Sequence, residues 1–184
     1  GYLLSVASNR RDYPNKMAQD DESHFGKLIF IHNKTFKHEI FSKGHRNQQG
    51  LLIYEQKIIS TEHGPKGGDE INIISYKKNY GWPISSYGTS YYKTNVKYKK
   101  SHKLHGFEEP IYSFVPSIGI SEIINLPSSF WKNNKINNLF LVSSLNGKSL
   151  FQIKFNDNLD KVIFIEKIFI GQRIRDLTLI NGNR

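Results

Sequence analysis

Short apolar runs separated by polar turns recur along this sequence from one end to the other. The runs have the length of strands, and they are rich in Ile, Phe and Tyr, which suit pleated, half-buried surfaces. A helical apolar stripe of convincing length does not occur in the sequence. The pattern predicts an all-β protein with strands at residues 2–7, 27–31, 51–54, 57–60, 70–75, 111–114, 118–124, 139–143, 150–155, 162–170 and 174–180.

The segments between these runs carry turn and loop signals. The runs 51–54 and 57–60 flank Glu55 and Gln56, which predicts a hairpin. Polar loops are expected at 8–22 and 44–50, and a long insertion at 76–109. Many short strands at this spacing suit a sandwich, a barrel or a β-propeller, and periodicity alone does not choose among them.

The least generic stretch of the chain is residues 61–72. It contains the pair Gly64-Pro65, in which proline fixes one φ angle, and the pair Gly67-Gly68, which permits backbone conformations that a Cβ would forbid. A main chain of this kind can turn sharply and present carbonyl or amide groups. The stretch is therefore a candidate ligand-binding loop.

Composition narrows the function classes. The 184-residue chain carries a formal net charge of +10, which invites a nucleic-acid or anionic-membrane partner. Lys, Asn and Ile are abundant, however, which is the residue usage of AT-rich codons, so charge alone is weak evidence. The absence of cysteine excludes disulfides and thiolate metal sites. The sequence opens at Gly1 with neither an initiator Met nor a signal-peptide pattern, and it holds no apolar run of membrane-spanning length.

Four motifs then occur in a specific order. They are GHRNQQGL at 44–51, EHGPKGGDEIN at 62–72, NYGWP at 79–83 and GQRIRD at 171–176. In this order they resemble the successive motifs of the soluble glucose/sorbosone (aldose sugar) dehydrogenases that use pyrroloquinoline quinone (PQQ). The resemblance extends to 18–19, 24–27 and 110–117, and so covers essentially the whole chain.

The resemblance implies a six-bladed β-propeller with the quinone over one end of the central channel. Residues 1–184 would form a single, incomplete propeller domain, roughly the middle-to-C-terminal half, truncated at the N-terminus and at the C-terminus. The histidine that acts as general base toward the sugar lies upstream in that family. We therefore assign that role to none of the histidines present, which are His24, His32, His38, His45, His63, His102 and His105.

Arg46, Asn47 and Gln49 lie in a short loop bounded by glycines, where a guanidinium and two amides can converge on a quinone tricarboxylate. By similarity, all three bind the cofactor, and Arg46 is the catalytic residue that faces the reactive quinone carbonyl. There its charge would stabilise negative charge developing on the quinone oxygen. The alternative is that Arg46 pairs with a carboxylate or caps a loop.

In the family, the carbonyl oxygens of a Gly-Pro pair bind a Ca²⁺ ion that also holds the quinone, which assigns the metal ligands to Gly64 and Pro65. His63 would touch the cofactor, and the alternative is a structural histidine satisfied by backbone. Asp69 and Glu70 are interpreted as a charged strand entry or turn cap and not as metal ligands.

Arg173 and Arg175 alternate along the last expected strand, so both side chains would share a face and suit a carboxylate of the cofactor, with Asp176 pointing the opposite way. The alternative is a pair of salt bridges between blades. By resemblance, then, the cofactor contacts include Arg173 and Arg175.

Three positions depart from the family pattern. Ala7-Ser8 replaces a Gly-Asp pair and Asn146 replaces a lysine, with Lys148 two residues on, so one cofactor contact is expected to be lost. Phe114 replaces a tryptophan, which keeps an aromatic wall but removes an indole donor.

The function implied for the complete protein is oxidation of an aldose at C1 to a lactone by hydride transfer to PQQ, followed by an external electron acceptor. This chain alone would be inactive without the base. The family is periplasmic or secreted, we expect no nucleic-acid partner and no membrane span, and a homodimer stays open.

Two alternatives remain. One is a non-catalytic propeller that serves as a binding module, favoured by the departures at Ser8 and Asn146. The other is nucleic-acid binding through the Tyr- and Lys-rich tract at 91–100, which we instead interpret as a solvated loop beside the substrate cleft.

Overall fold

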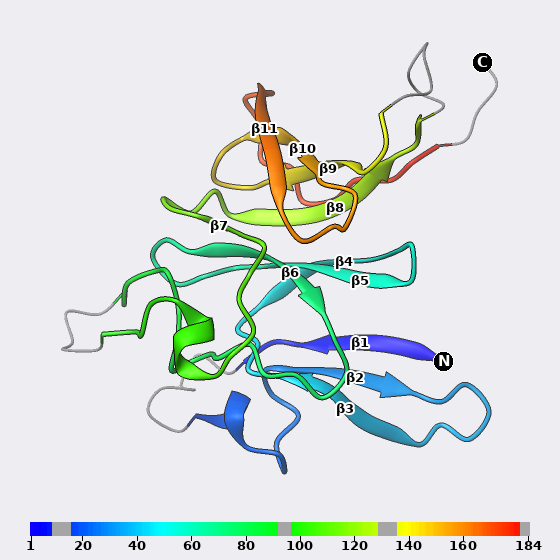
Figure 1. Ribbon diagram of the computed structural model, residues 1–184, viewed down its shortest axis with the longest axis vertical. Coiled ribbons are helices and arrows are strands. Elements are labelled where there is room, and N and C mark those ends of the chain that lie inside the picture. The colour runs from blue at the N-terminus through cyan, green and yellow to red at the C-terminus, as the bar shows by residue number, and fades with distance from the viewer. Residues whose placement is uncertain (9–15, 92–96, 129–135, 181–184) are drawn as a thin grey trace.

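The computed structural model describes residues 1–8, 16–91, 97–128 and 136–180, and this part of the chain folds into three antiparallel sheets (Figure 1). The first sheet consists of β1 (Tyr2–Val6), β2 (Lys27–Ile31) and β3 (His38–Lys43). The second consists of β4 (Gln48–Tyr54), β5 (Lys57–Glu62), β6 (Asp69–Ile74) and β7 (Tyr112–Phe114). The third consists of β8 (Ile120–Leu126), β9 (Leu139–Ser144), β10 (Ser149–Phe155) and β11 (Val162–Phe169).

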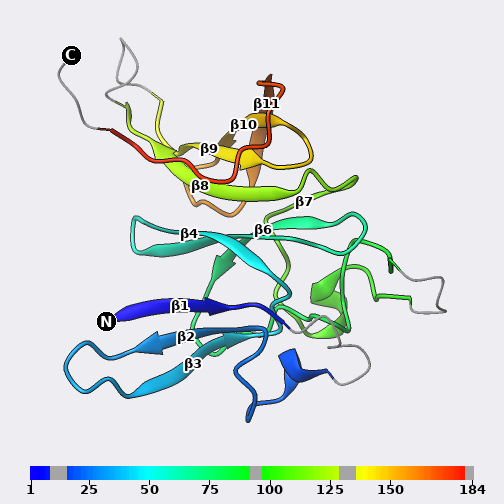
Figure 2. The ribbon, with the colours of Figure 1, turned by 180° about the vertical axis from the view of Figure 1, so that it is seen from behind.

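Strands that follow one another in sequence are neighbours within each sheet, and the sheets stack in chain order (Figures 1 and 2). Two short 3₁₀ helices, η1 (Met17–Gln19) and η2 (His102–His105), lie in the loops. Successive meandering antiparallel sheets of this kind are typical of propeller blades. The all-β prediction is confirmed.

The hairpin prediction is also confirmed. Glu55 and Gln56 join β4 to β5 with φ angles of 46° and 64°, as a two-residue turn of type I′ requires. The strand β3 was missed because its sequence, HEIFSK, leaves most of its side chains exposed or half-buried and so shows no clean alternation.

The strand expected at 174–180 is wrong. This segment has isolated hydrogen bonds instead of a ladder: the amide of Ile174 donates to the Ser144 carbonyl, and the carbonyl of Arg175 accepts from the Ser121 hydroxyl. A strand needs a continuous partner, and among the described residues the segment has none.

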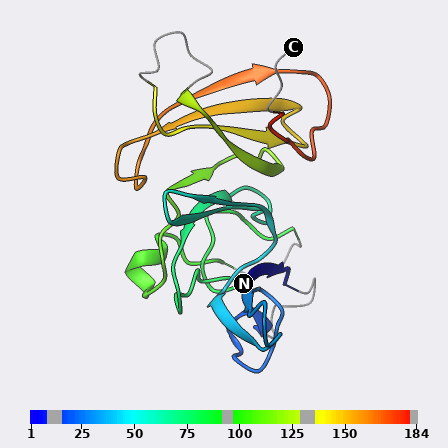
Figure 3. The ribbon, with the colours of Figure 1, turned by 90° about the vertical axis from the view of Figure 1, so that its right-hand side faces the viewer.

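The sheets stack on one another, as the side view in Figure 3 shows, and the apolar core lies between them. The layer between the second and third sheets is extensive and includes Ile71, Ile123, Phe140 and Ile153. The layer between the first and second sheets is smaller, with Leu28, Ile74 and Tyr80 at its centre. Because these layers align the ends of the strands, the loops that follow them meet at one side of the stack.

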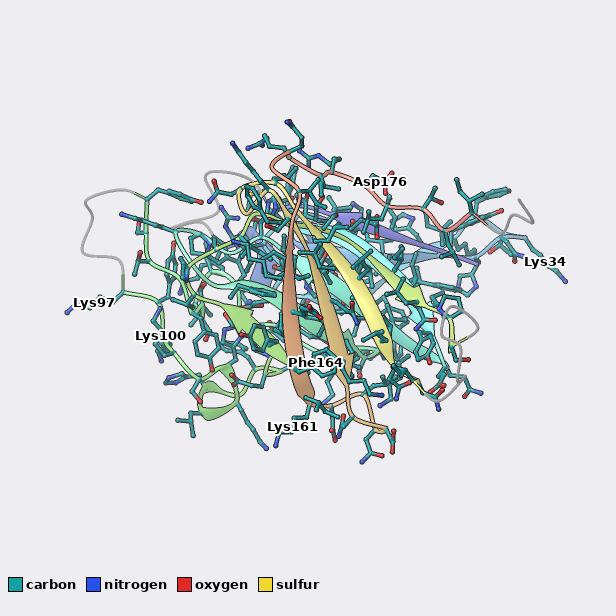
Figure 4. All side chains as sticks on the ribbon, turned by 90° about the horizontal axis from the view of Figure 1, so that it is seen from above. Lys34, Lys97, Lys100, Lys161, Phe164 and Asp176 are labelled. Atoms are coloured by element: carbon teal, nitrogen blue, oxygen red, sulfur yellow. The ribbon has the colours of Figure 1, made fainter. Side chains whose placement is uncertain are left out.

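The surface has two further features. Among the described strands β11 pairs with β10 alone, and it exposes Ile163, Phe164 and Phe169 on the outside of the third sheet, where Figure 4 labels Phe164. Lys34 lies at the opposite end of the view in Figure 4 from Lys97 and Lys100, which lie close to each other. No helix in the described ranges is long and apolar enough to cross a membrane.

Candidate cofactor site

The loops at one end of the second sheet converge on a narrow pocket that is partly open to solvent. Its walls come from the loop before β4, the end of β5, the turn to β6, the segment after Tyr80 and the helix η2. The pocket brings together three of the four motifs singled out in the sequence, without the one at 171–176, and its lining residues are Arg46, Glu62, His63, Gly64, Pro65, Glu70, Tyr80, Trp82, Ser85, Ser86 and His102.

Arg46 is half-buried in this pocket and is held at both ends. Its guanidinium donates to the carbonyl of His63 at 2.9 Å and lies over the ring of Trp82, with Cζ 5.3 Å from the centroid. Its backbone amide donates to the carboxylate of Glu62. Among the described carboxylates none pairs with the guanidinium, so the charge of Arg46 is oriented without being neutralised.

Asn47 and Gln49 are joined to each other and to Arg175. Gln49 Nε2 donates to Asn47 Oδ1 at 3.1 Å, and Arg175 Nη1 donates to Gln49 Oε1 at 2.9 Å. Arg175 therefore reaches the site from the far end of the chain. Arg173 is exposed, and because the segment is no strand, the argument that placed it on one face with Arg175 does not hold.

His63 links the two groups of residues. Its Nδ1 lies 3.4 Å from Asn47 Nδ2, whereas its buried Nε2 has no hydrogen-bond partner among the described residues. Burial lowers the pKa of His63, and the charges of Arg46 and Arg175 lower it further, although Asp69 opposes them. A neutral imidazole with one orphaned buried nitrogen is suited to hydrogen-bond a ligand.

The turn from His63 to Asp69 is tightly folded. A Cβ at Gly64 would lie 2.1 Å from the carbonyl oxygen of Gly68, and Gly68 itself has a φ of 72°. The carboxylate of Asp69 accepts from the amides of Gly64, Ile118 and Ile120, each at 3.0 Å. The interpretation of Asp69 as a turn cap at a strand entry is confirmed.

These features bear on whether the site suits calcium. Within the described ranges, no group of three or more His, Asp and Glu side chains could hold a metal ion. The oxygens that remain are carbonyls of the turn, a hard-ligand set of the kind that Ca²⁺ accepts. The carbonyl of Pro65 accepts a hydrogen bond from the Tyr91 hydroxyl at 3.1 Å, which leaves one lone pair free.

Sequence reasoning missed two buried histidine–glutamate pairs beside the pocket. His45 Nδ1 lies 3.1 Å from Glu62 Oε2, and His102 Nε2 lies 3.5 Å from Glu70 Oε1. Glu70 is buried at the start of β6, the strand entry expected from the sequence, and its pKa is raised well above the usual value by burial and then by the charge of Glu62. The sequence does show that Glu62 and Glu70 flank the same loop. It gives no indication of their histidine partners.

The departures from the family pattern have distinct places. Ser8 contacts the site: its amide donates to the Arg46 carbonyl at 2.7 Å and its hydroxyl accepts from Trp82 Nε1 at 3.1 Å. Phe114 lies in the apolar core against Phe151, so it forms no wall of the pocket. Asn146 lies in the turn between β9 and β10, where its amide donates to the Ile118 carbonyl.

Stacked meandering antiparallel sheets with an arginine- and histidine-bearing pocket at their loop ends are typical of propeller-type proteins. The chain belongs to the glucose/sorbosone dehydrogenase family, whose family model matches residues 1–182. It is 30% identical over 181 residues to an uncharacterized protein of Synechocystis, covering 90% of this chain and 43% of that protein. It is also 30% identical over 197 residues to the aldose sugar dehydrogenase YliI of Escherichia coli, covering 96% of this chain and 51% of that protein.

Solved structures agree with the family. The soluble aldose sugar dehydrogenase of Escherichia coli in its apo-form matches with a TM-score of 0.78 and 29% identity, over 95% of this chain and 53% of that one. The PQQ-bound aldose sugar dehydrogenase of Streptomyces coelicolor shares the fold, with a TM-score of 0.67 and 20% identity, over 94% of this chain and 47% of that one. The chain thus spans about half the length of the relatives that it matches.

Proposed function

We propose that the complete protein oxidises an aldose sugar at C1 to a lactone, with PQQ as the electron acceptor and Ca²⁺ as its partner ion. Family membership supports a sugar oxidoreductase. Two observations carry the proposal: the guanidinium of Arg46 is oriented by the His63 carbonyl and pairs with no described carboxylate, and the buried Nε2 of His63 has no hydrogen-bond partner among the described residues. PQQ, when bound, would supply a two-electron acceptor that the protein side chains lack.

The residues of this chain are proposed to bind the cofactor and to stabilise the charge that develops on it. Arg46 presents fixed positive charge, which costs little reorganisation when negative charge develops nearby. Asn47, Gln49 and Arg175 form one hydrogen-bonded set that suits a carboxylate, and Arg173 would join it only by a change in side-chain position. The carbonyls of Gly64 and Pro65 would hold Ca²⁺. The base that takes the sugar proton is proposed to lie outside residues 1–184.

Reconstitution tests the proposal directly. The complete protein is mixed with PQQ and Ca²⁺, quinone binding is followed by absorbance, and aldose-dependent dye reduction is followed as activity. We expect Arg46→Ala to lower kcat by about 10²-fold, since it removes one preorganised electrostatic contact. Absence of both quinone binding and dye reduction in the unsubstituted protein would remove the enzyme proposal.

The two late arginines provide a matched comparison. Arg175→Ala removes the donor to Gln49 and is expected to weaken PQQ binding, whereas Arg173→Ala leaves that hydrogen bond in place and is expected to weaken it less. Equal losses in the two variants would show that both guanidiniums reach the quinone.

Calcium dependence is tested by chelation. Treatment with EGTA should weaken PQQ binding, and added Ca²⁺ should restore it. Tyr91→Phe frees the Pro65 carbonyl of its hydroxyl donor, so we expect its Ca²⁺ affinity to rise by about twofold to fivefold, the worth of one weak hydrogen bond. PQQ affinity that is indifferent to EGTA would contradict the ion's role.

Each alternative function has its own test. A non-catalytic binding module would bind PQQ or sugar without dye reduction. Nucleic-acid binding predicts oligonucleotide affinity that falls steeply with salt. A periplasmic or secreted location and a homodimer stay part of the proposal by family analogy.

A further inference from the structure

The indole of Trp82 lies against the guanidinium of Arg46, at 5.3 Å from Cζ to the ring centroid. Both residues line the same pocket, although 36 positions separate them in the sequence. A guanidinium over the face of a tryptophan ring is attracted by the ring's quadrupole. The contact costs less side-chain entropy when a second contact already restricts the rotamers of the arginine. Here the second contact is the carbonyl of His63, at 2.9 Å from Nη1.

Trp82 is itself fixed by its backbone. Its amide donates to the carbonyl of Gly44 at 2.9 Å, and its carbonyl accepts from Gln19 Nε2 at 2.6 Å. Gln19 is held in turn by a reciprocal pair of amide hydrogen bonds with Asn79, at 2.7 and 3.1 Å. The main chain that carries the indole is therefore tied to the loop before Arg46 and to the η1 segment.

Ser8 fixes the rotation of the ring. Its hydroxyl accepts from the indole Nε1 of Trp82 at 3.1 Å, while its amide donates to the carbonyl of Arg46 at 2.7 Å. One small residue thus contacts both partners of the cation–π pair. Ser8 is also the position at which the sequence departs from the family's Gly-Asp pair.

We infer that Trp82 is a positioning residue for Arg46, that its ring and the His63 carbonyl together hold the guanidinium toward the pocket, and that Ser8 sets the angle of that ring. Only the expected effect on quinone binding rests on the proposed function. The placement of Arg46 by Trp82 exists without any ligand. A test therefore needs a readout of Arg46 itself.

That readout is side-chain NMR of the complete protein labelled with ¹⁵N-arginine and free of cofactor. Arg46 is assigned from the signal that Arg46→Lys removes. We expect its Nε–H resonance to be shifted by the indole ring current and to show slow rotation about the Nε–Cζ bond. Trp82→Leu should abolish both signatures, Trp82→Phe should reduce them, and Ser8→Ala should change the shift while leaving the ring in place.

The inference is overturned if Trp82→Leu or Trp82→Phe folds and leaves the shift and rotation of Arg46 unchanged. The phenylalanine variant keeps the test available where the leucine variant does not fold, because it retains an aromatic ring. Tyr76→Leu is the matched control, since it removes the exposed pair of Lys77 over the Tyr76 ring, at 5.2 Å. We expect it to leave the Arg46 resonance as it is.

Quinone titration supplies the second arm. Trp82→Leu should weaken PQQ binding by about fivefold to thirtyfold, the range of a partly desolvated cation–π contact, and Tyr76→Leu should not weaken it. A lack of PQQ binding by the unsubstituted protein would refute the proposed function while the NMR arm still decides the placement of Arg46. Unaltered PQQ affinity in a Trp82→Leu variant whose Arg46 has become mobile would refute the link between placement and binding.

Discussion

Glu62 and Glu70 stand directly opposite each other on β5 and β6, yet their surroundings differ. Glu62 accepts from the backbone amide of Arg46 and lies 3.1 Å from Nδ1 of His45, whose other nitrogen lies 2.8 Å from the Ser42 hydroxyl. Glu70 has Asn72 Nδ2 at 3.2 Å and a longer approach to His102, at 3.5 Å. Glu62 therefore has a close partner at each carboxylate oxygen, and its cross-strand neighbour Glu70 does not.

The difference explains how two carboxylates can share one buried site. Like charges directly opposite on a sheet destabilise it, and a buried carboxyl that lacks donors keeps its proton. Burial is the main cause that raises the pKa of Glu70, and the charge of Glu62 is the second. The donors on Glu62 also shape the loop that carries Arg46, so the site depends on one member of the pair far more than on the other.

The largest expected effect is therefore that of Glu62→Gln. A glutamine offers one carbonyl oxygen where the carboxylate serves both the Arg46 amide and His45, so one buried donor would lose its partner. We expect a loss of about 3 kcal/mol in the free energy of unfolding, measured in urea at pH 7. Glu70→Gln is the matched control and should cost less than about 1 kcal/mol. Equal losses would show that the two sites do not differ.

The next effect is in the pH dependence of stability. Because the folded pKa of Glu70 lies above the usual 4.5, the native state binds this proton more tightly than the unfolded state does. The stability that Glu70 contributes is complete below pH 4.5 and is lost as the pH rises through its folded pKa. Glu70→Gln cannot ionise, so it should become more stable relative to the unsubstituted protein as the pH rises from 4.5, by up to about 1.4 kcal/mol per pH unit.

His102 titrates in the opposite sense and has to be separated. Burial lowers its pKa below 6.5, so its contribution is complete above pH 6.5 and is lost as the pH falls through the folded pKa. The comparison of Glu70→Gln is therefore repeated with His102→Phe present in both proteins. A stability difference that stays flat from pH 4.5 to 8 in that background would contradict the raised pKa of Glu70.

Much of the fold could be predicted from the sequence because apolar runs and turn residues act locally. β2 begins and ends where its run does, and Glu55-Gln56 makes the expected hairpin. β3 and the segment 174–180 could not be placed, since an exposed strand shows little alternation and a strand forms only where a neighbour supplies its ladder. That neighbour is decided by the tertiary structure.

The site was predictable only as far as its motifs reach. The loops bearing Arg46 and His63 do meet in one pocket, whereas the roles given to the site residues stay predictions. Trp82 belongs to a motif but gave no sign of its contact with Arg46. His102 could not be found at all, because it lies in the long insertion and reaches Glu70 through a fold that no local pattern encodes.

The smallest expected effect on stability concerns the two histidines that lie beside these glutamates. Neither ring nitrogen of His102 has a hydrogen-bond partner among the described residues, and its ring stacks on Tyr87 at 5.3 Å with an angle of 9° between the planes. Phe has a similar shape and no polar atoms, so His102→Phe should change the free energy of unfolding at pH 7 by less than about 1 kcal/mol in either direction. His45→Phe, in contrast, would remove the histidine partner of the Ser42 hydroxyl and of Glu62 Oε2, leaving Glu62 the Arg46 amide, and should cost about 2 kcal/mol. A larger loss for His102→Phe than for His45→Phe, measured in the same urea titration, would mean that Glu70 relies on its histidine as much as Glu62 does.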